Sequence, residues 1–263
     1  MAGRALPRRL TAEAVGTGLL VAVVVGSGIA AQRLSPDDVG LQLLENSIAT
    51  GAALVALILA FGPVSGAHFN PVVTVADRAL GGLSTADAVA YMAAQVTGGC
   101  VGAMVANAMF DLDLVTLSTH ERSSGGLWLG EIVATFGLLT VILGVVRSDR
   151  PAAAPYAVGG YIAAAYWFTS STSFAYPAVT IARSLSDTFA GIAPSSVPLS
   201  VASQLAGGPA AFALARFLFP GAHADPVVVS MVPHPHQQPE VLTHTWCGPR
   251  PRDHGALHGD GRR

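Results

Sequence analysis

One short pattern occurs twice in this chain, as Phe69-Asn70-Pro71-Val72-Val73-Thr74-Val75-Ala76 and, 106 positions later, as Ala175-Tyr176-Pro177-Ala178-Val179-Thr180-Ile181-Ala182. The two copies share the proline, the Val-Thr pair and the last alanine. They differ at the residue before the proline, which is Asn70 in one copy and Tyr176 in the other. Proline suits the first turn of a helix. Each copy therefore predicts a short helix, about 70–79 and 177–185.

Six apolar segments surround the two copies, and each is about 20 residues long, enough to cross the hydrocarbon core of a bilayer. The chain is 51% hydrophobic and 11% charged, whereas a soluble domain carries about 25% charged residues. We therefore predict an all-α membrane protein with six transmembrane helices and two half-helices that enter the bilayer without crossing it. The predicted spans are about Thr11–Ala31, Gly40–Phe61, Asp87–Phe110, Leu127–Val146, Pro155–Ser171 and Val197–Phe219.

The duplication extends into the spans. Glu13 and its Glu-x-x-Gly-Thr motif in the first span are echoed by Glu131 in the fourth, and Gln95 in the third span is echoed by Gln204 in the sixth. Each half, about 11–110 and 127–219, holds three spans and one short helix. An odd number of spans gives the halves opposite orientations, and such an inverted repeat predicts a site near the bilayer midplane, where the short helices meet.

The arginines predict the orientation, since the chain contains no lysine. With the N-terminus in the cytoplasm, that side holds eleven of the 14 arginines, or seven against three without the C-terminal tail. Excess positive charge marks cytoplasmic loops. We therefore predict a multi-pass protein of the inner (plasma) membrane, with a channel domain at 11–220 and cytoplasmic ends at 1–10 and 221–263. The tail holds six of the eight histidines and many prolines, a composition typical of disorder.

Nothing in the sequence predicts an enzyme, a cofactor or a metal site. Cys100 and Cys247 form no Cys-x-x-Cys pair, and the spans contain no nucleophile beside a base. A net charge of −2 gives no reason to expect a nucleic-acid partner. The predicted surroundings are the lipid bilayer and small uncharged solutes.

The half-helices predict a pore. Non-helical chain at membrane depth must be buried in protein or line a water-filled path. The N-terminus of each half-helix carries partial positive charge. Two such ends that face each other repel cations and protons, while amide side chains there donate hydrogen bonds to a passing oxygen. Neutral solutes are expected to pass and ions to be rejected.

The first loop, Ser65-Gly66-Ala67-His68-Phe69-Asn70-Pro71-Val72, closely resembles the first signature loop of the aquaporin, or major intrinsic protein, family. The Glu13 motif, the Gln95 motif and the second loop match the same family, over roughly residues 8–219. The resemblance implies an aquaporin-like fold, usually a homotetramer with one pore per subunit, and passive conduction of water or small uncharged solutes. The pore signature residues it implies are Asn70, Pro71, Val72, Tyr176, Pro177 and Ala178.

The second loop departs from the family at Val179, where the family has an arginine in the extracellular constriction. By offset from the signature loops, the resemblance places Thr50, Ala164 and Ser173 beside Val179. These four small, uncharged residues predict a wide filter without a fixed cation, one that passes glycerol-sized polyols or neutral metalloid hydroxides such as arsenite. The second loop also resembles bacterial arsenic-associated aquaglyceroporins. Arg183 is left open, either as a replacement for the missing arginine or as a charge that complements the helix C-terminus.

Tyr176 is the second departure, because a bulky phenol replaces a carboxamide at the predicted waist of the pore. We expect reduced or abolished conductance unless the ring turns out of the lumen. The alternative function is therefore a non-conducting, aquaporin-fold structural or interaction protein of the membrane.

Three further residues are expected to support the loops. Ionisable side chains within spans face the protein interior, and the resemblance implies that Glu13 and Glu131 accept hydrogen bonds from loop N–H groups. His68 has two interpretations, either lining the cytoplasmic vestibule or making a structural hydrogen bond to the loop.

Overall fold

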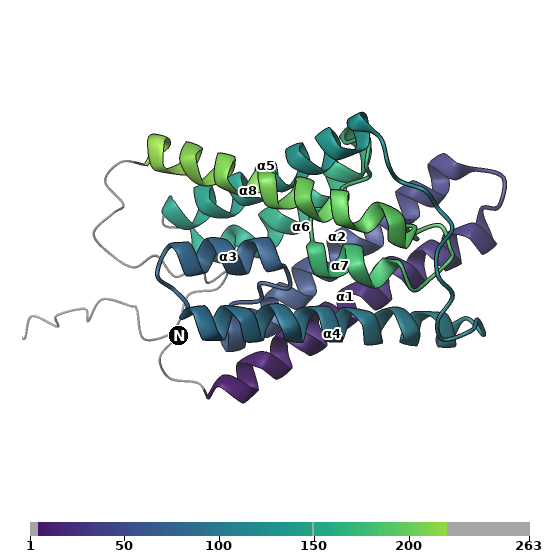
Figure 1. Ribbon diagram of the computed structural model, residues 1–263, viewed down its shortest axis with the longest axis horizontal. Coiled ribbons are helices and arrows are strands. Elements are labelled where there is room, and N and C mark those ends of the chain that lie inside the picture. Colours follow the sequence, from purple (N-terminus) through teal and green to yellow (C-terminus); the bar gives the residue numbers. More distant parts are fainter. Residues whose placement is uncertain (1–4, 149, 220–263) are drawn as a thin grey trace, which may run out of the picture. The chain divides into compact units, whose positions relative to one another are not determined.

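The computed structural model describes residues 5–148 and 150–219, and every regular element in those residues is helical (Figure 1). The predicted tail at 221–263 lies outside the described residues, and so do residues 1–4. The α-helices are α1 (Leu6–Leu34), α2 (Val39–Ser65), α3 (Pro71–Ala79), α4 (Thr85–Met109), α5 (Gly125–Arg147), α6 (Ala154–Phe168), α7 (Pro177–Arg183) and α8 (Val197–Leu218), and the 3₁₀ turns are η1 (Pro151–Ala153) and η2 (Pro194–Ser196).

Five helices are long and apolar enough to cross a membrane, namely α1, α2, α4, α5 and α8 with its preceding turn. The predicted fifth span is α6, which has 15 residues and so rises about 22 Å. It is short because the chain enters through the η1 turn and leaves the helix at Thr169, where the backbone becomes extended. At the other end of the chain, α1 begins at Leu6, so the helix extends into the segment predicted to be a cytoplasmic terminus.

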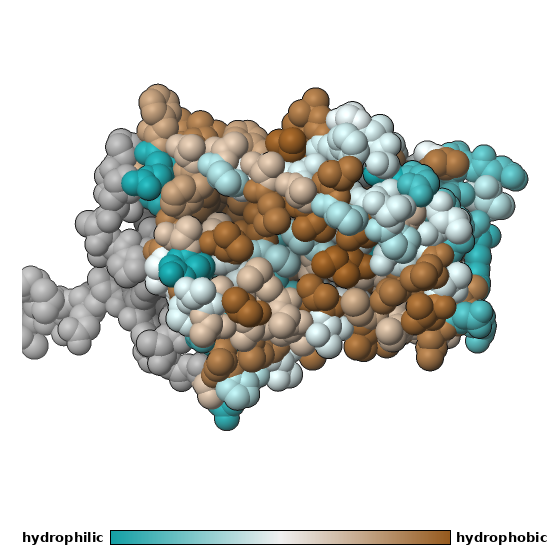
Figure 2. Space-filling model, viewed as in Figure 1, coloured by the Kyte–Doolittle hydropathy of each residue, from teal (hydrophilic) through white to brown (hydrophobic). Residues whose placement is uncertain are grey.

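The helices pack as an inverted repeat. Within each half the first and third long helices pack together, α1 on α4 and α5 on α8, and the halves meet where α2 packs on α6. Each half-helix reaches into the opposite half, since α7 contacts α4 and α1, and α3 contacts α8. The first turn of α1 and the last turn of α8 lie at the same end of the bundle (Figure 1). Strongly hydrophilic residues gather toward the ends of the face in Figure 2, with apolar residues over much of the surface between.

Glycines bring α1 and α4 into backbone contact. A Cβ added to Gly98 would lie 2.0 Å from the carbonyl oxygen of Ala14, and one added to Gly102 would lie 2.0 Å from that of Gly18. The Gly-x-x-x-Gly pair of α4 thus packs within the subunit, which lets two backbones approach closely in a membrane.

Gly102→Ala is expected to destabilise the fold, because neither backbone can yield to the added methyl group. Overpacking of this kind costs about 1–3 kcal/mol. The melting temperature of the detergent-solubilised protein measures the loss. Gly160→Ala in α6 is the matched control, since an added Cβ there meets nothing within 4 Å. Equal melting temperatures for the two variants would contradict the proposed role of the contact.

Candidate functional site

The two signature loops share an unusual backbone. Ala67 and Phe69 have φ values of 51° and 48°, and Ser173 and Ala175, at the same 106-residue offset, have 51° and 50°. The left-handed region costs a non-glycine residue about 1–2 kcal/mol. The surrounding protein therefore has to hold both loops in place.

Glu13 holds the first loop. Its carboxylate is fully buried and accepts hydrogen bonds from the backbone N–H groups of His68 at 3.0 Å and Phe69 at 2.8 Å. Ser65 Oγ donates to it at 2.6 Å and Gln95 Nε2 at 2.8 Å. The buried charge is thus compensated by four donors, including the N–H of the strained Phe69.

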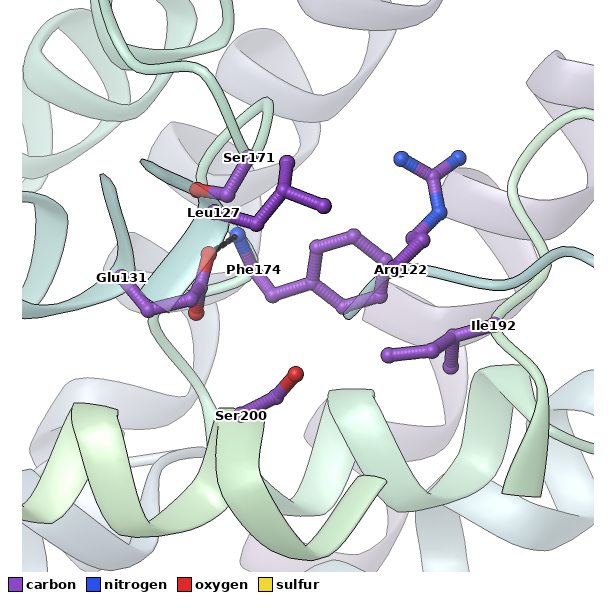
Figure 3. A pocket seen from close by; sticks show the side chains of 7 residues that line it. All are labelled: Arg122, Leu127, Glu131, Ser171, Phe174, Ile192 and Ser200. Atoms are coloured by element: carbon purple, nitrogen blue, oxygen red, sulfur yellow. Dashed lines mark hydrogen bonds between the residues drawn. The ribbon is translucent and has the colours of Figure 1, made fainter. Parts of the chain in front are cut away.

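Glu131 holds the second loop in the corresponding way. It accepts hydrogen bonds from the N–H groups of Phe174 and Ala175, both at 2.9 Å, and from Gln204 Nε2. Figure 3 shows the bond to Phe174 beside a small cavity of about 10 Å³ that Ser171 and Ser200 also line. Each half of the repeat therefore has one buried carboxylate that binds the backbone of its own loop, Glu13 in the first half and Glu131 in the second.

A threonine and a glutamine complete each half. Gln95 Nε2 donates to Thr74 Oγ1 at 3.0 Å, and that hydroxyl donates to the Asn70 carbonyl oxygen at 3.1 Å. Gln204 Nε2 donates to Thr180 Oγ1 at 2.7 Å, and that hydroxyl donates to the Tyr176 carbonyl oxygen at 3.0 Å. The Val-Thr pair shared by the two copies thus ties each half-helix to its glutamine.

The residues that cap the half-helices break this symmetry. Asn70 Oδ1 accepts from the N–H of Val72 at 2.9 Å, and Nδ2 donates across the repeat to the Ala175 carbonyl oxygen at 3.0 Å. Tyr176 occupies the same cap position of α7 and makes no side-chain cap hydrogen bond. Its ring is 5% exposed and lines a cavity on the side of the second loop.

This second-loop cavity contains three of the four predicted filter residues, Thr50, Ser173 and Val179. It has a free volume of about 10 Å³, roughly what one water molecule needs. The cavity is lined by Leu20, Val24, Thr50, Leu54, Ile162, Tyr166, Ser173, Phe174, Tyr176, Val179 and Arg183.

Ala164 does not belong to this cavity, and its predicted place in the filter is wrong. The residue is exposed on the outer side of α6. Two positions along a helix correspond to about 200° of rotation, so Tyr166 faces inward instead and lies 3.1 Å from Thr50, hydroxyl to hydroxyl. The expectation of four small filter residues also fails, because Tyr166 and Arg183 bring a phenol and a guanidinium to the cavity.

Arg122 was not singled out from the sequence, because it lies in a loop without a motif. Its Nε donates to the Gly191 carbonyl oxygen at 2.9 Å, and its guanidinium lies 5.3 Å from the Phe174 ring centroid (Figure 3). Burial lowers the pKa of Arg122 from its ordinary value, and the Glu131 charge opposes that change. Arg122 thus anchors the loop between α4 and α5 against the Phe174 ring, which lines both small cavities.

His68 lies inside the protein, 1% exposed. Its Nδ1 is 3.2 Å from Thr74 Oγ1, and its ring packs on Tyr91 with centroids 5.4 Å apart. Of the two interpretations open from the sequence, these contacts favour the structural one.

The structure is that of a helical membrane protein. It has five membrane-length helices, the shorter α6, and two half-helices tied to buried carboxylates. Residues 3–175 match the family described as Major intrinsic protein. The chain belongs to the major intrinsic protein family, and its fold is the aquaporin fold. Members of this family are channels, so the protein is a multi-pass membrane channel and not an enzyme.

Several relatives agree with this assignment. The chain is 52% identical over 213 residues to Aquaglyceroporin AqpS of Rhizobium meliloti (strain 1021), covering 81% of this chain and 91% of that protein. It is 34% identical over 167 residues to Aquaporin Z of Photorhabdus laumondii subsp. laumondii, covering 58% and 71%. The X-ray structure of the aquaglyceroporin from Plasmodium falciparum has a TM-score of 0.63 at 20% identity, covering 82% of this chain and 98% of that chain. That last likeness concerns the fold alone.

Proposed function

We propose that the protein is a passive channel for water and small neutral solutes, including solutes of glycerol size and neutral metalloid hydroxides such as arsenite. The observation that carries the proposal is the pair of loops related by the inverted repeat, each bound by its own carboxylate, with Asn70 at the start of one half-helix. Thr50, Ser173 and Val179 are the small, uncharged part of the cavity lining, and they support passage beyond water once Tyr176 or Arg183 moves aside. The 52% identity to an aquaglyceroporin supports the same solute class.

The assembly belongs to the same proposal. We infer a homotetramer with one pore per subunit and both termini in the cytoplasm. The arginine distribution supports the orientation. Exposed apolar side chains on the long helices, such as Ile48 of α2 and Trp167 of α6, support contact with lipid or with neighbouring subunits.

A specific observation favours a second candidate, a non-conducting protein with this fold. Tyr176 and Arg183 both occupy the cavity, which leaves about 10 Å³. Glycerol passes only if one of these side chains moves. In the non-conducting alternative neither side chain moves, and the protein serves only as a structural or interaction protein of the membrane, here called the scaffold alternative.

Light scattering of proteoliposomes separates the two candidates. If the protein is a conducting channel, liposomes that contain it respond faster than empty liposomes to an osmotic gradient, which measures water flux. They also swell faster in inward gradients of glycerol and of trivalent arsenite at neutral pH, where the hydroxide is uncharged. They admit no sodium ions. Permeability to water but to no larger solute would overturn the wide solute range. Rates equal to those of empty liposomes for every solute would establish the scaffold alternative.

A further inference from the structure

Arg183 lines the same second-loop cavity as Val179, the residue that stands where the family has an arginine. Arg183 is the last residue of α7, four positions and therefore about one turn after Val179. Residues four apart lie on the same face of a helix, and helical side chains lean toward the N-terminus of their helix, so Arg183 and Val179 lie on one face of α7. Both residues line the second-loop cavity, together with Thr50 and Ser173.

The contacts of Arg183 hold its guanidinium in place but leave its outer donors unused. The residue is 3% exposed. Its Nε donates to the Ala190 carbonyl oxygen, and its guanidinium carbon lies 3.5 Å from the Phe174 ring centroid. Within residues 5–148 and 150–219, neither terminal nitrogen of Arg183 donates a hydrogen bond, and no carboxylate lies within ion-pair distance of it.

These contacts argue against the alternative role, in which Arg183 only complements the C-terminus of its helix. The acceptor of its Nε is Ala190 in the following loop, and the end of α7 is instead closed by backbone bonds from Ser184 to Ile181 and from Leu185 to Ala182. A buried cation without a counter-ion is costly, and the face of Phe174 offsets part of that cost. Such a charge is tolerated where its donors meet water or a solute.

We propose that Arg183 is the specificity-determining cation of the extracellular constriction, displaced by one helical turn from the position where the family carries its arginine. Its charge repels protons and other cations, and its terminal nitrogens donate to the oxygens of neutral solutes. The inference rests on the proposed function, because it assigns the discriminating residue of that same pore.

Proteoliposomes containing Arg183→Met test the proposal, because methionine keeps an apolar stem and removes the charge. A pH-sensitive dye under an imposed membrane potential measures proton leak, and light scattering measures glycerol and water flux. The Met variant is expected to leak protons faster than wild type, because the fixed charge that forms the electrostatic barrier is gone, and to pass glycerol faster relative to water. Arg183→Lys, which keeps the charge, is expected to restore proton exclusion.

Two further variants separate a pore charge from a structural role. Val179→Arg in the Arg183→Met background returns a cation to the cavity and is expected to abolish the proton leak. Arg33→Met is the matched control, because Arg33 also donates to a carbonyl oxygen, that of Phe110, and also stacks on a phenylalanine ring, while lying exposed outside the cavity. It is expected to behave as wild type.

Each outcome decides the proposal. Equal proton leak in wild type and Arg183→Met would overturn it, and so would a leak that Val179→Arg leaves unchanged. If Arg183→Met does not reconstitute, Arg183→Gln, which keeps a donor for Ala190, takes its place. A silent wild type with a leaking Met variant would refute the proposed function and support the role of Arg183. If no variant conducts, Tyr176→Asn included, the proposed channel function and the proposed role of Arg183 are both refuted.

Discussion

Tyr176→Asn is expected to raise solute flux on the order of tenfold over wild type. Asparagine removes the ring that lines the second-loop cavity. It also places a carboxamide at the counterpart of Asn70, whose own carboxamide donates across the repeat in the first loop. It also gives α7 the N-cap that it lacks, which is worth about 1 kcal/mol and rigidifies the waist. Stopped-flow light scattering of proteoliposomes with matched protein density measures water and glycerol permeability.

Tyr176→Phe is the control, because it keeps the ring and removes only the hydroxyl group. Its flux is expected to stay near the wild-type value. If Tyr176→Asn conducts no faster than Tyr176→Phe, the ring does not obstruct the pore. If instead Tyr176→Phe alone raises the flux, the hydroxyl group and not the ring volume limits conduction.

Glu131→Gln is expected to abolish selective flux and to lower the melting temperature. The carboxylate accepts three hydrogen bonds through two oxygens, and glutamine offers one acceptor oxygen in their place. Buried N–H groups left without a partner cost about 1–3 kcal/mol each, and the loop they release carries three residues with left-handed φ values, Thr172, Ser173 and Ala175. Fluorescence-detected size-exclusion chromatography after heating measures stability, and the swelling assay measures flux.

An exposed carboxylate supplies the comparison for this variant. Glu121 accepts hydrogen bonds from Ser195 at 2.9 Å and Ser196 at 3.0 Å at the surface, so Glu121→Gln is expected to change neither stability nor flux appreciably. Similar losses in the two variants would mean that the position of Glu131 under the loop is unimportant.

The architecture could be predicted from the sequence because the same motifs occur in both halves of the chain. The Pro and Val-Thr frame of the two copies, and the paired Glu and Gln motifs, depend on spacing along the chain, and these are the groups found together in both hydrogen-bond networks. The family assignment follows from the same motifs and agrees with the match over residues 3–175.

The filter was harder to predict because it depends on helix rotation and side-chain direction. α6 is apolar all round, so its sequence carries no amphipathic signal that separates the outward Ala164 from the inward Tyr166. For Arg183, spacing alone left two roles open, a replacement for the missing arginine or a charge that complements the C-terminus of its helix. In the structure Arg183 lines the cavity together with Val179, and its guanidinium stacks on the Phe174 ring.

The exchange of half-helices between the two halves bears on how the chain is made. During synthesis α1 emerges well before α4, and α4 before α7, its partner in the second half. Chains are made from the N-terminus at about 5–20 residues per second, so α4 waits several seconds with the face that α7 will cover still unfilled. The translocon or lipid has to shield that face in the interval. Biogenesis of this channel is therefore complete only when the last helices have been released into the bilayer. A ribosome stalled after α6 leaves an incomplete protein in which the α7-binding face of α4 is uncovered.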